Sequence, residues 1–237
     1  MTMTAARPAG MNRDRIFYTG MAAAILLTVF AGFAPTYYLK TYTGTPALSW
    51  VLHAHGAAYS AWILLFLSQT VLIASDRADI HRPLGIAGAV LALIMVPLGI
   101  AAATWSIRAG HTPPGIDPRS FLVLPFFDLA LFAIFVTTGI VKRRQSQAHK
   151  RLLLLATITM LDAAIARLPG LFTLGPPVFF AIQDLFLLVA IFYDYKSRGR
   201  VHPVYIWGGA LLVVSVPLRL MISGTDAWRG IAEFLTR

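Results

Sequence analysis

The chain has 237 residues, of which 57% are hydrophobic and only 13% are charged, and it contains no cysteine. A soluble domain carries about 25% charged residues, so the composition excludes an ordinary soluble domain, and the lack of cysteine excludes disulfides, thiolate metal sites and cysteine nucleophiles. The net charge of +10 sits in short clusters beside apolar stretches rather than in a stripe with aromatic residues, so nucleic acid is not an expected partner.

Seven apolar segments follow one another along the chain, each close to the ~20 residues that a helix needs to cross a hydrocarbon core. Helices are the expected spanning structure, because they satisfy their own backbone polar groups in lipid, and the alternating pattern of a membrane β-barrel is missing. We therefore predict an all-α, polytopic membrane helix bundle with about seven transmembrane helices. The predicted spans are 17–39, 47–73, 83–105, 121–141, 151–172, 177–195 and 203–222.

The basic residues predict the orientation of the bundle. Thirteen of them lie in the amino-terminal tail and in the turns after the second, fourth and sixth spans, against five on the other side. Because Lys and Arg accumulate on the cytoplasmic side, we expect a cytoplasmic amino terminus and a periplasmic carboxyl terminus in an inner membrane. The predicted parts are a disordered cytoplasmic tail (1–12), a transmembrane domain (13–223) and a short periplasmic tail (224–237).

Three histidines stand where a predicted helix leaves the basic side of the membrane. They are His81 in HRPLG, His149 in AHKRL and His202 in GRVHP. A histidine in this position can cap the free N–H groups of a helix start or contact lipid headgroups. It can also bind a cofactor, and the sequence leaves both interpretations open.

Ionisable side chains also occur inside the predicted spans, where each costs several kcal/mol and is by default a functional hypothesis. With a rise of about 1.5 Å per residue, those of five spans fall in the half of the membrane away from the basic turns. They are His53, His55, Asp128, Asp162, Arg167, Asp184 and Arg219. One interpretation is a structural ion-pair network of Arg167, Arg219, Asp162 and Asp184. The other is a site for a metal, a cofactor or a migrating proton.

For a divalent metal ion, the predicted ligands are His55, Asp128, Asp162 and Asp184. Nitrogen and oxygen donors without thiolate suit iron, zinc or Cu(II) more than Cu(I). For a cofactor such as haem b, the predicted binding residues are His55, His53, His81 and His149.

Helical spacing separates the two histidines of the HAH motif. Their directions differ by about 200° on an ideal helix, so His53 and His55 are not expected to hold one ion together. His55 is the one expected to point inward, because it begins a helical stripe. The stripe continues with Tyr59, Trp62, Phe66 and Gln69.

Two known classes of seven-helix protein do not fit these residues. A microbial rhodopsin needs a lysine buried in the bundle, but Lys40, Lys142, Lys150 and Lys196 all lie at the ends of spans. The HxxxH pair of membrane lipid hydrolases is missing from the sequence, and so are the HExxH, GxSxG and P-loop motifs.

The segments LHAHG, HRPLGIAGAV, AHKRLLLLATITM and RGRVHP, which lie between Leu52 and Pro203, resemble a family of uncharacterised bacterial multi-pass membrane proteins. The histidine pattern is also loosely similar to the histidine-bearing bundles of cytochrome b561 and of oxidase-assembly proteins. This resemblance implies haem b or a metal held by paired histidines on facing helices.

Three functions remain open at this level. The first is a metal- or haem-associated redox or oxidase-assembly role. The second is proton-coupled transport of a small molecule, with protons carried by Asp162 and Asp184. The third is a non-catalytic accessory subunit whose charges only lock helices together. The expected partners are the lipid bilayer and either a larger membrane complex or a second copy of the chain, and the sequence leaves enzymatic activity undecided.

Overall fold

The computed structural model describes residues 9–112 and 116–237, and every regular element within these ranges is a helix. In the described ranges, six helices are long and apolar enough to cross a membrane, which makes the protein a multi-pass helix bundle. The six candidate spans are Arg13–Tyr38, Trp50–Ala74, Ala78–Arg108, Pro118–Val141, Pro176–Arg198 and Pro203–Ser223. Seven spans are therefore not confirmed.

The long helices are α1 (Ala9–Phe33), α3 (Trp50–Ala74), α4 (Ala78–Arg108), α6 (Val123–Val141), α7 (Ser146–Ile158), α9 (Pro176–Arg198) and α10 (Pro203–Ser223). Shorter elements join or follow them: the π-helical turn η1 (Ala34–Tyr38), α2 (Lys40–Thr43), α5 (Pro118–Phe121), α8 (Asp162–Ile165), the 3-10 turn η2 (Phe172–Leu174) and α11 (Asp226–Thr236).

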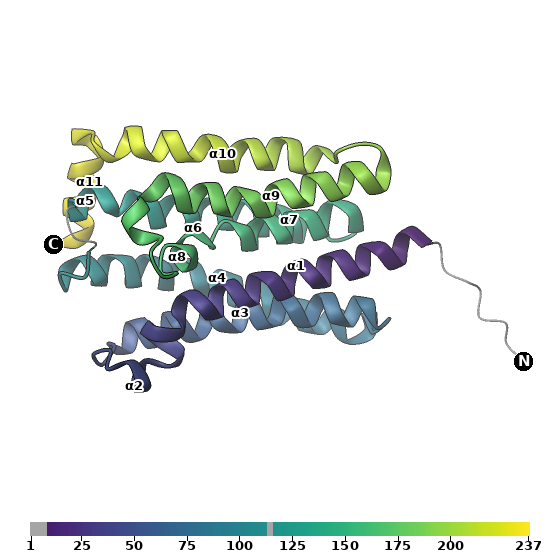
Figure 1. Ribbon diagram of the computed structural model, residues 1–237, viewed down its shortest axis with the longest axis horizontal. Helices are drawn as coiled ribbons and strands as arrows, with labels where there is room; N and C mark the ends of the chain where they lie inside the picture. Colours follow the sequence, from purple (N-terminus) through teal and green to yellow (C-terminus); the bar gives the residue numbers. More distant parts are fainter. Residues whose placement is uncertain (1–8, 113–115) are drawn as a thin grey trace, which may run out of the picture.

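The long helices lie side by side along the longest axis of the molecule (Figure 1). The start of α1 and the α3–α4, α6–α7 and α9–α10 turns gather at the right-hand end of this view. We call this the basic end, because it holds the Lys and Arg clusters of the sequence. The elements α2, α5, α8 and α11 lie at the opposite end.

The fifth predicted span, 151–172, is not one continuous helix. After 13 residues α7 ends, and the chain turns before the single turn α8 begins. Thr159 and Leu161 of this break are buried, as lipid cannot satisfy non-helical backbone at membrane depth. The side-chain amide of Gln183 in α9 donates to the carbonyl oxygen of Ile158 at 2.6 Å, which satisfies an acceptor at the end of α7.

The broken helix forms the centre of the bundle. Most of its side chains are buried, namely Ala148, Arg151, Leu152, Leu154, Leu155, Ala156, Thr157 and Ile158. Glycines on the neighbouring helices allow this close packing: an added Cβ would lie 2.3 Å from Leu153 at Gly139 and 2.5 Å from Leu155 at Gly208. By contrast, the peripheral helices expose large apolar side chains, including Ile86, Leu93, Val141, Phe192, Ile206 and Met221, as a lipid-facing surface requires.

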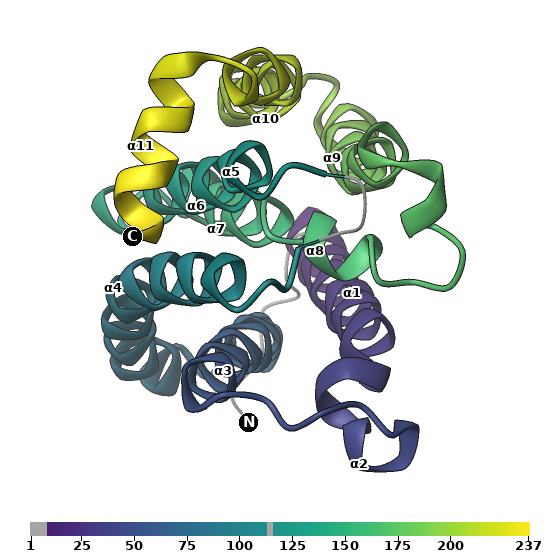
Figure 2. The same cartoon turned by 90° about the vertical axis from the view of Figure 1, so that its left-hand side faces the viewer.

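The two predicted tails stay predictions. The structure describes α1 from Ala9 onward, and residues 1–8 of the predicted amino-terminal tail lie outside the described part. The predicted periplasmic tail contains α11, which lies across the end of the bundle (Figure 2). Trp228 of α11 donates from its indole N–H to the carbonyl oxygen of Arg119 at 2.9 Å, so this helix is tied to the α5 turn.

Candidate functional site

A pocket with a volume of about 440 Å³ lies at the basic end, between α1, α3, α4, α6 and α7. This volume is in the range of roughly 300–1,000 Å³ that is usual for sites that bind small molecules and cofactors. The apolar walls are formed by Trp62, Leu65, Phe66, Val136, Ile140 and Leu153. The pocket could therefore hold a largely apolar ligand.

The carboxyl-terminal part of the stripe predicted on α3 lines this pocket. Trp62, Phe66 and Gln69 line the pocket. Trp62 is 3% exposed, and its indole N–H donates to the hydroxyl of Thr157 in α7 at 3.3 Å. The side-chain amide of Gln69 donates to the carbonyl oxygen of His81 at 3.2 Å, while its Oε1 is buried and has no hydrogen-bond partner in ranges 9–112 and 116–237.

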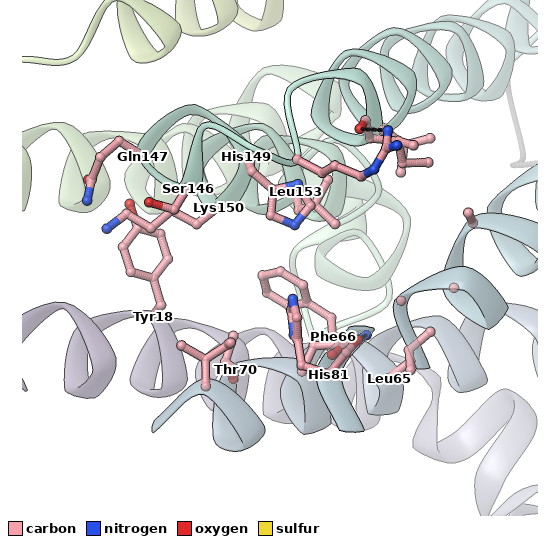
Figure 3. Close-up of a pocket in the computed structure, with 18 of the residues that line it drawn as sticks. Tyr18, Leu65, Phe66, Thr70, His81, Ser146, Gln147, His149, Lys150 and Leu153 are labelled. Carbon is pink, nitrogen blue, oxygen red and sulfur yellow. Dashed lines mark hydrogen bonds between the residues drawn. The ribbon is translucent and has the colours of Figure 1, made fainter. Parts of the chain in front are cut away.

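Two of the predicted cofactor-binding histidines meet in the pocket. His81 comes from α4 and His149 from α7, and Figure 3 shows both on the pocket walls with their rings directed inward. Nδ1 of His149 lies 2.8 Å from the carbonyl oxygen of Gly139. A carbonyl can only accept, so Nδ1 carries a proton, and in the neutral ring Nε2 then has the lone pair. Nδ1 of His81 is buried without a hydrogen-bond partner among the described residues.

Basic side chains surround the polar side of the same pocket. Arg15, Arg143 and Lys150 belong to its lining. Arg15 pairs with Asp76 at 2.6 Å, and Lys150 pairs with Asp14 at 2.5 Å. The guanidinium of Arg143 donates to the carbonyl oxygen of Ile140 in its own turn, at 3.2 Å. Such a rim suits a ligand that carries an anionic group beside its apolar body.

A second polar cluster lies beside α8, towards the opposite end. Nη1 of Arg219 donates to Oδ1 of Asp128 at 2.7 Å, and Nη2 donates to the hydroxyl of Ser215 at 2.9 Å. The side chain of Arg219 is 2% exposed, and its guanidinium stacks over the ring of Phe180 at 4.8 Å. The carboxyl group of Asp162, a residue 6% exposed, is close enough to Asp128 to interact with it.

The two histidines of the HAH motif lie in different surroundings. His53 is exposed, and its ring centroid is 6.0 Å from that of Tyr37. His55 is half-buried, and its ring centroid is 4.0 Å from that of Tyr59. Within the described part of the chain, Nδ1 of His55 is buried without a hydrogen-bond partner. Neither ring belongs to the pocket of His81 and His149.

Two members of the predicted ion network do not join it. Arg167 is exposed, donates to the carbonyl oxygen of Ala163 at 2.6 Å, and stacks over the ring of Phe33 at 4.6 Å. Oδ1 of Asp184 is buried without a hydrogen-bond partner among residues 9–112 and 116–237. The cluster that forms instead consists of Arg219, Asp128 and Asp162.

The predicted divalent-metal site is not assembled. No group of three or more His, Asp or Glu side chains in the described ranges could hold a metal ion. Of the four predicted ligands, Asp128 and Asp162 approach each other, whereas His55 and Asp184 do not complete a coordination group with them.

Sequence reasoning missed a buried ion pair at the basic end. Arg151, which was counted with the basic turn, is fully buried and pairs with Asp194 through Nη2 and, at 3.0 Å, through Nε. The same carboxylate accepts from Arg198 at 3.1 Å and from the backbone N–H of His202 at 3.0 Å. The available signal was an acidic residue four positions before Arg198, within an otherwise basic segment.

His202 has the capping role that was one interpretation of the basic-side histidines. Its Nδ1 accepts the backbone N–H of Val204 at 3.1 Å at the start of α10. Burial and the nearby charge of Arg151 lower the pKa of His202, so the unprotonated ring that can accept this bond is favoured.

Comparison of the chain with protein-family models, with curated proteins and with solved structures finds no match.

Proposed function

We propose that the protein is a redox protein of a bacterial inner membrane that binds one haem b in the pocket between His81 and His149. The observation that carries the proposal is the arrival of two imidazoles, from α4 and α7, in one largely apolar pocket of about 440 Å³. The resemblance of the histidine pattern to the cytochrome b561 type supports the same reading. The amino terminus and the basic end would then face the cytoplasm, as the positive-inside rule indicates.

The two histidine side chains in the pocket fit haem b. His149 donates through Nδ1 to Gly139, and this bond fixes the ring and leaves Nε2 free, which is the usual arrangement of a histidine that ligates a metal. Nδ1 of His81 is buried and has no hydrogen-bond partner in the described residues, so the ring of His81 can still bind a ligand. His81 and His149 would hold the haem iron, and the bound haem would supply one-electron transfer.

The remaining residues would select and orient the ligand. Trp62, Phe66 and Leu153 present apolar surface that excludes water from the cavity. Arg143 would neutralise a carboxylate of haem b by charge-assisted hydrogen bonds, together with Arg15 and Lys150, which also pair with Asp76 and Asp14.

The test is the absorption spectrum of protein purified in detergent and supplied with haemin, recorded before and after dithionite. We expect a Soret band that shifts on reduction, one haem per chain, and loss of this spectrum in His81→Ala and His149→Ala. The matched controls are His53→Ala and His111→Ala, because both side chains are exposed; they should keep the wild-type spectrum. A wild-type protein that binds no haemin, or His81 and His149 variants with unchanged spectra, would refute the proposal.

A further inference from the structure

The cluster beside α8 brings together groups from three helices at the break in the central helix. Asp128 belongs to α6, Arg219 to α10 and Asp162 to α8. The cluster is enclosed, since Arg219 is 2% exposed and Asp162 is 6% exposed. The Asp128 side chain is 13% exposed and is therefore the more accessible carboxyl group.

The cluster has one more carboxyl group than it has cations. In the part of the chain that the structure describes, Arg219 is the one cation within 4.0 Å of either carboxylate, and it pairs with Asp128 at 2.7 Å. Asp162 receives one backbone N–H, from Ala163 at 2.7 Å, and lies next to the Asp128 carboxyl group. Two neighbouring carboxylates in a medium of low dielectric constant cannot both ionise beside one cation at low cost.

The other polar groups that face the cluster do not restore the balance. Tyr59 of α3 lies near Asp128, but its phenol carries no positive charge. Its hydroxyl donates to the carbonyl oxygen of Met95. Arg167, in the segment after α8, acts on Asp162 only from a distance and donates to a backbone carbonyl. His55 lies near Arg167, and its Nδ1 makes no hydrogen bond within ranges 9–112 and 116–237. The Nε–H of Arg219 also lacks a partner in those ranges.

We infer that Asp128 and Asp162 form a proton-binding site inside the membrane, in which Arg219 neutralises one carboxylate and the other carries one exchangeable proton. The proton belongs to the pair rather than to either residue, because the two carboxyl groups are neighbours and share one cation. Removal of either carboxyl group lets Arg219 neutralise the one that remains, and the proton is then released. This inference goes beyond haem binding and does not depend on it.

Infrared spectroscopy of the purified protein tests this, because the carbonyl stretch of a protonated carboxylic acid is separate from the bands of a carboxylate. The experiment is best performed in an Asp184→Asn background, since Asp184 has its own buried, unpartnered oxygen in the described structure. At pH 7 we expect one protonated-acid band, which shifts in D₂O because the proton exchanges. Either Asp128→Asn or Asp162→Asn should abolish it, and Arg219→Gln should double it.

Asp79→Asn is the control, because Asp79 is exposed and pairs with Arg77 at 3.1 Å; the band should be unchanged. Absence of the band in the Asp184→Asn protein would overturn the inference. Survival of the band at full strength in both Asn variants would do the same, and so would a band that does not shift in D₂O. If Arg219→Gln does not fold, the two Asn variants still decide the question, because each keeps the native cation.

Discussion

Two buried ion clusters in the described part of the bundle differ in which partner is in excess, the cation or the carboxyl group. At the basic end, the carboxylate of Asp194 is shared by Arg151 and Arg198 and also accepts a backbone N–H. Beside α8, one guanidinium stands against the two carboxyl groups of Asp128 and Asp162. A carboxylate with two cationic partners stays ionised, because those partners stabilise its charge. A second carboxyl group without a cation of its own is stabilised by a proton instead. The first cluster is therefore a structural lock and the second a site that can change its charge.

The largest effect is expected from Asp194→Asn at the basic end. This change removes the charge that compensates the fully buried Arg151, and breaking a buried pair in this way costs about 3–5 kcal/mol of unfolding free energy. Arg198→Gln should cost less, because Arg151 still neutralises Asp194. Unfolding in detergent, followed by circular dichroism during a thermal or denaturant titration, measures both. As a control, Arg77→Gln alters an exposed ion pair and should leave the unfolding transition in place.

Beside α8 we expect the opposite order: loss of the cation should destabilise the protein more than loss of a carboxylate, because this cluster, in the described residues, has only one cation for two carboxyl groups. Arg219→Gln leaves two carboxyl groups without a cation and should lower the unfolding free energy by about 3 kcal/mol. Asp162→Asn should change it much less, because Asp128 and Arg219 remain paired. A larger loss from Asp162→Asn than from Arg219→Gln would show that the second cluster is balanced in another way, and the contrast between the clusters would fail.

The fold was largely predictable because its main signals are local in the sequence. Apolar length predicted the six helices that the structure confirms as candidate spans. The break after Ile158 was not predictable in this way, since TITMLD contains neither proline nor glycine. What stabilises the break is tertiary, because the side chain of Gln183 from another helix satisfies the freed carbonyl. Hydropathy alone therefore describes 151–172 as one span.

The candidate sites were predictable only as lists of residue types. Burial cost singled out Asp128, Asp162 and Arg219 as residues that need partners, but the choice of partner depends on helix rotation, which the sequence does not specify. His81 and His149 were predicted as cofactor-binding residues without a common site, because the pocket that both line depends on how α4 and α7 are placed around it, and the sequence does not specify this. An acidic residue within a basic segment, such as Asp194, is the signal that charge counting overlooks.

A smaller effect is expected where α1 packs on the broken helix. A Cβ added at Gly32 would lie 2.1 Å from the carbonyl oxygen of Ala164, and backbone cannot move aside as a side chain can. Gly32→Ala should therefore lower the unfolding free energy by about 1–3 kcal/mol, and it should disturb the α8 cluster more than the basic end. Gly20→Ala in the same helix is the matched control, as nothing lies within 4 Å of its added Cβ. Equal behaviour of the two variants would contradict this packing.

The smallest effect concerns the pH dependence of the basic end, where His202 caps α10. Burial and Arg151 lower its pKa in the folded protein, while the unfolded chain has the ordinary value of about 6.5. The unfolded state thus binds this proton first as the pH falls, so the stabilisation is complete above that value and is lost below it. His202→Asn keeps a capping acceptor without titrating, so its unfolding temperature should fall less between pH 8 and pH 5.5 than that of the wild type. The difference is small because His202 is only half-buried and solvent screens its charge. The exposed His111→Asn should retain the wild-type pH dependence, and an identical dependence in the His202 variant would place the titrating group elsewhere.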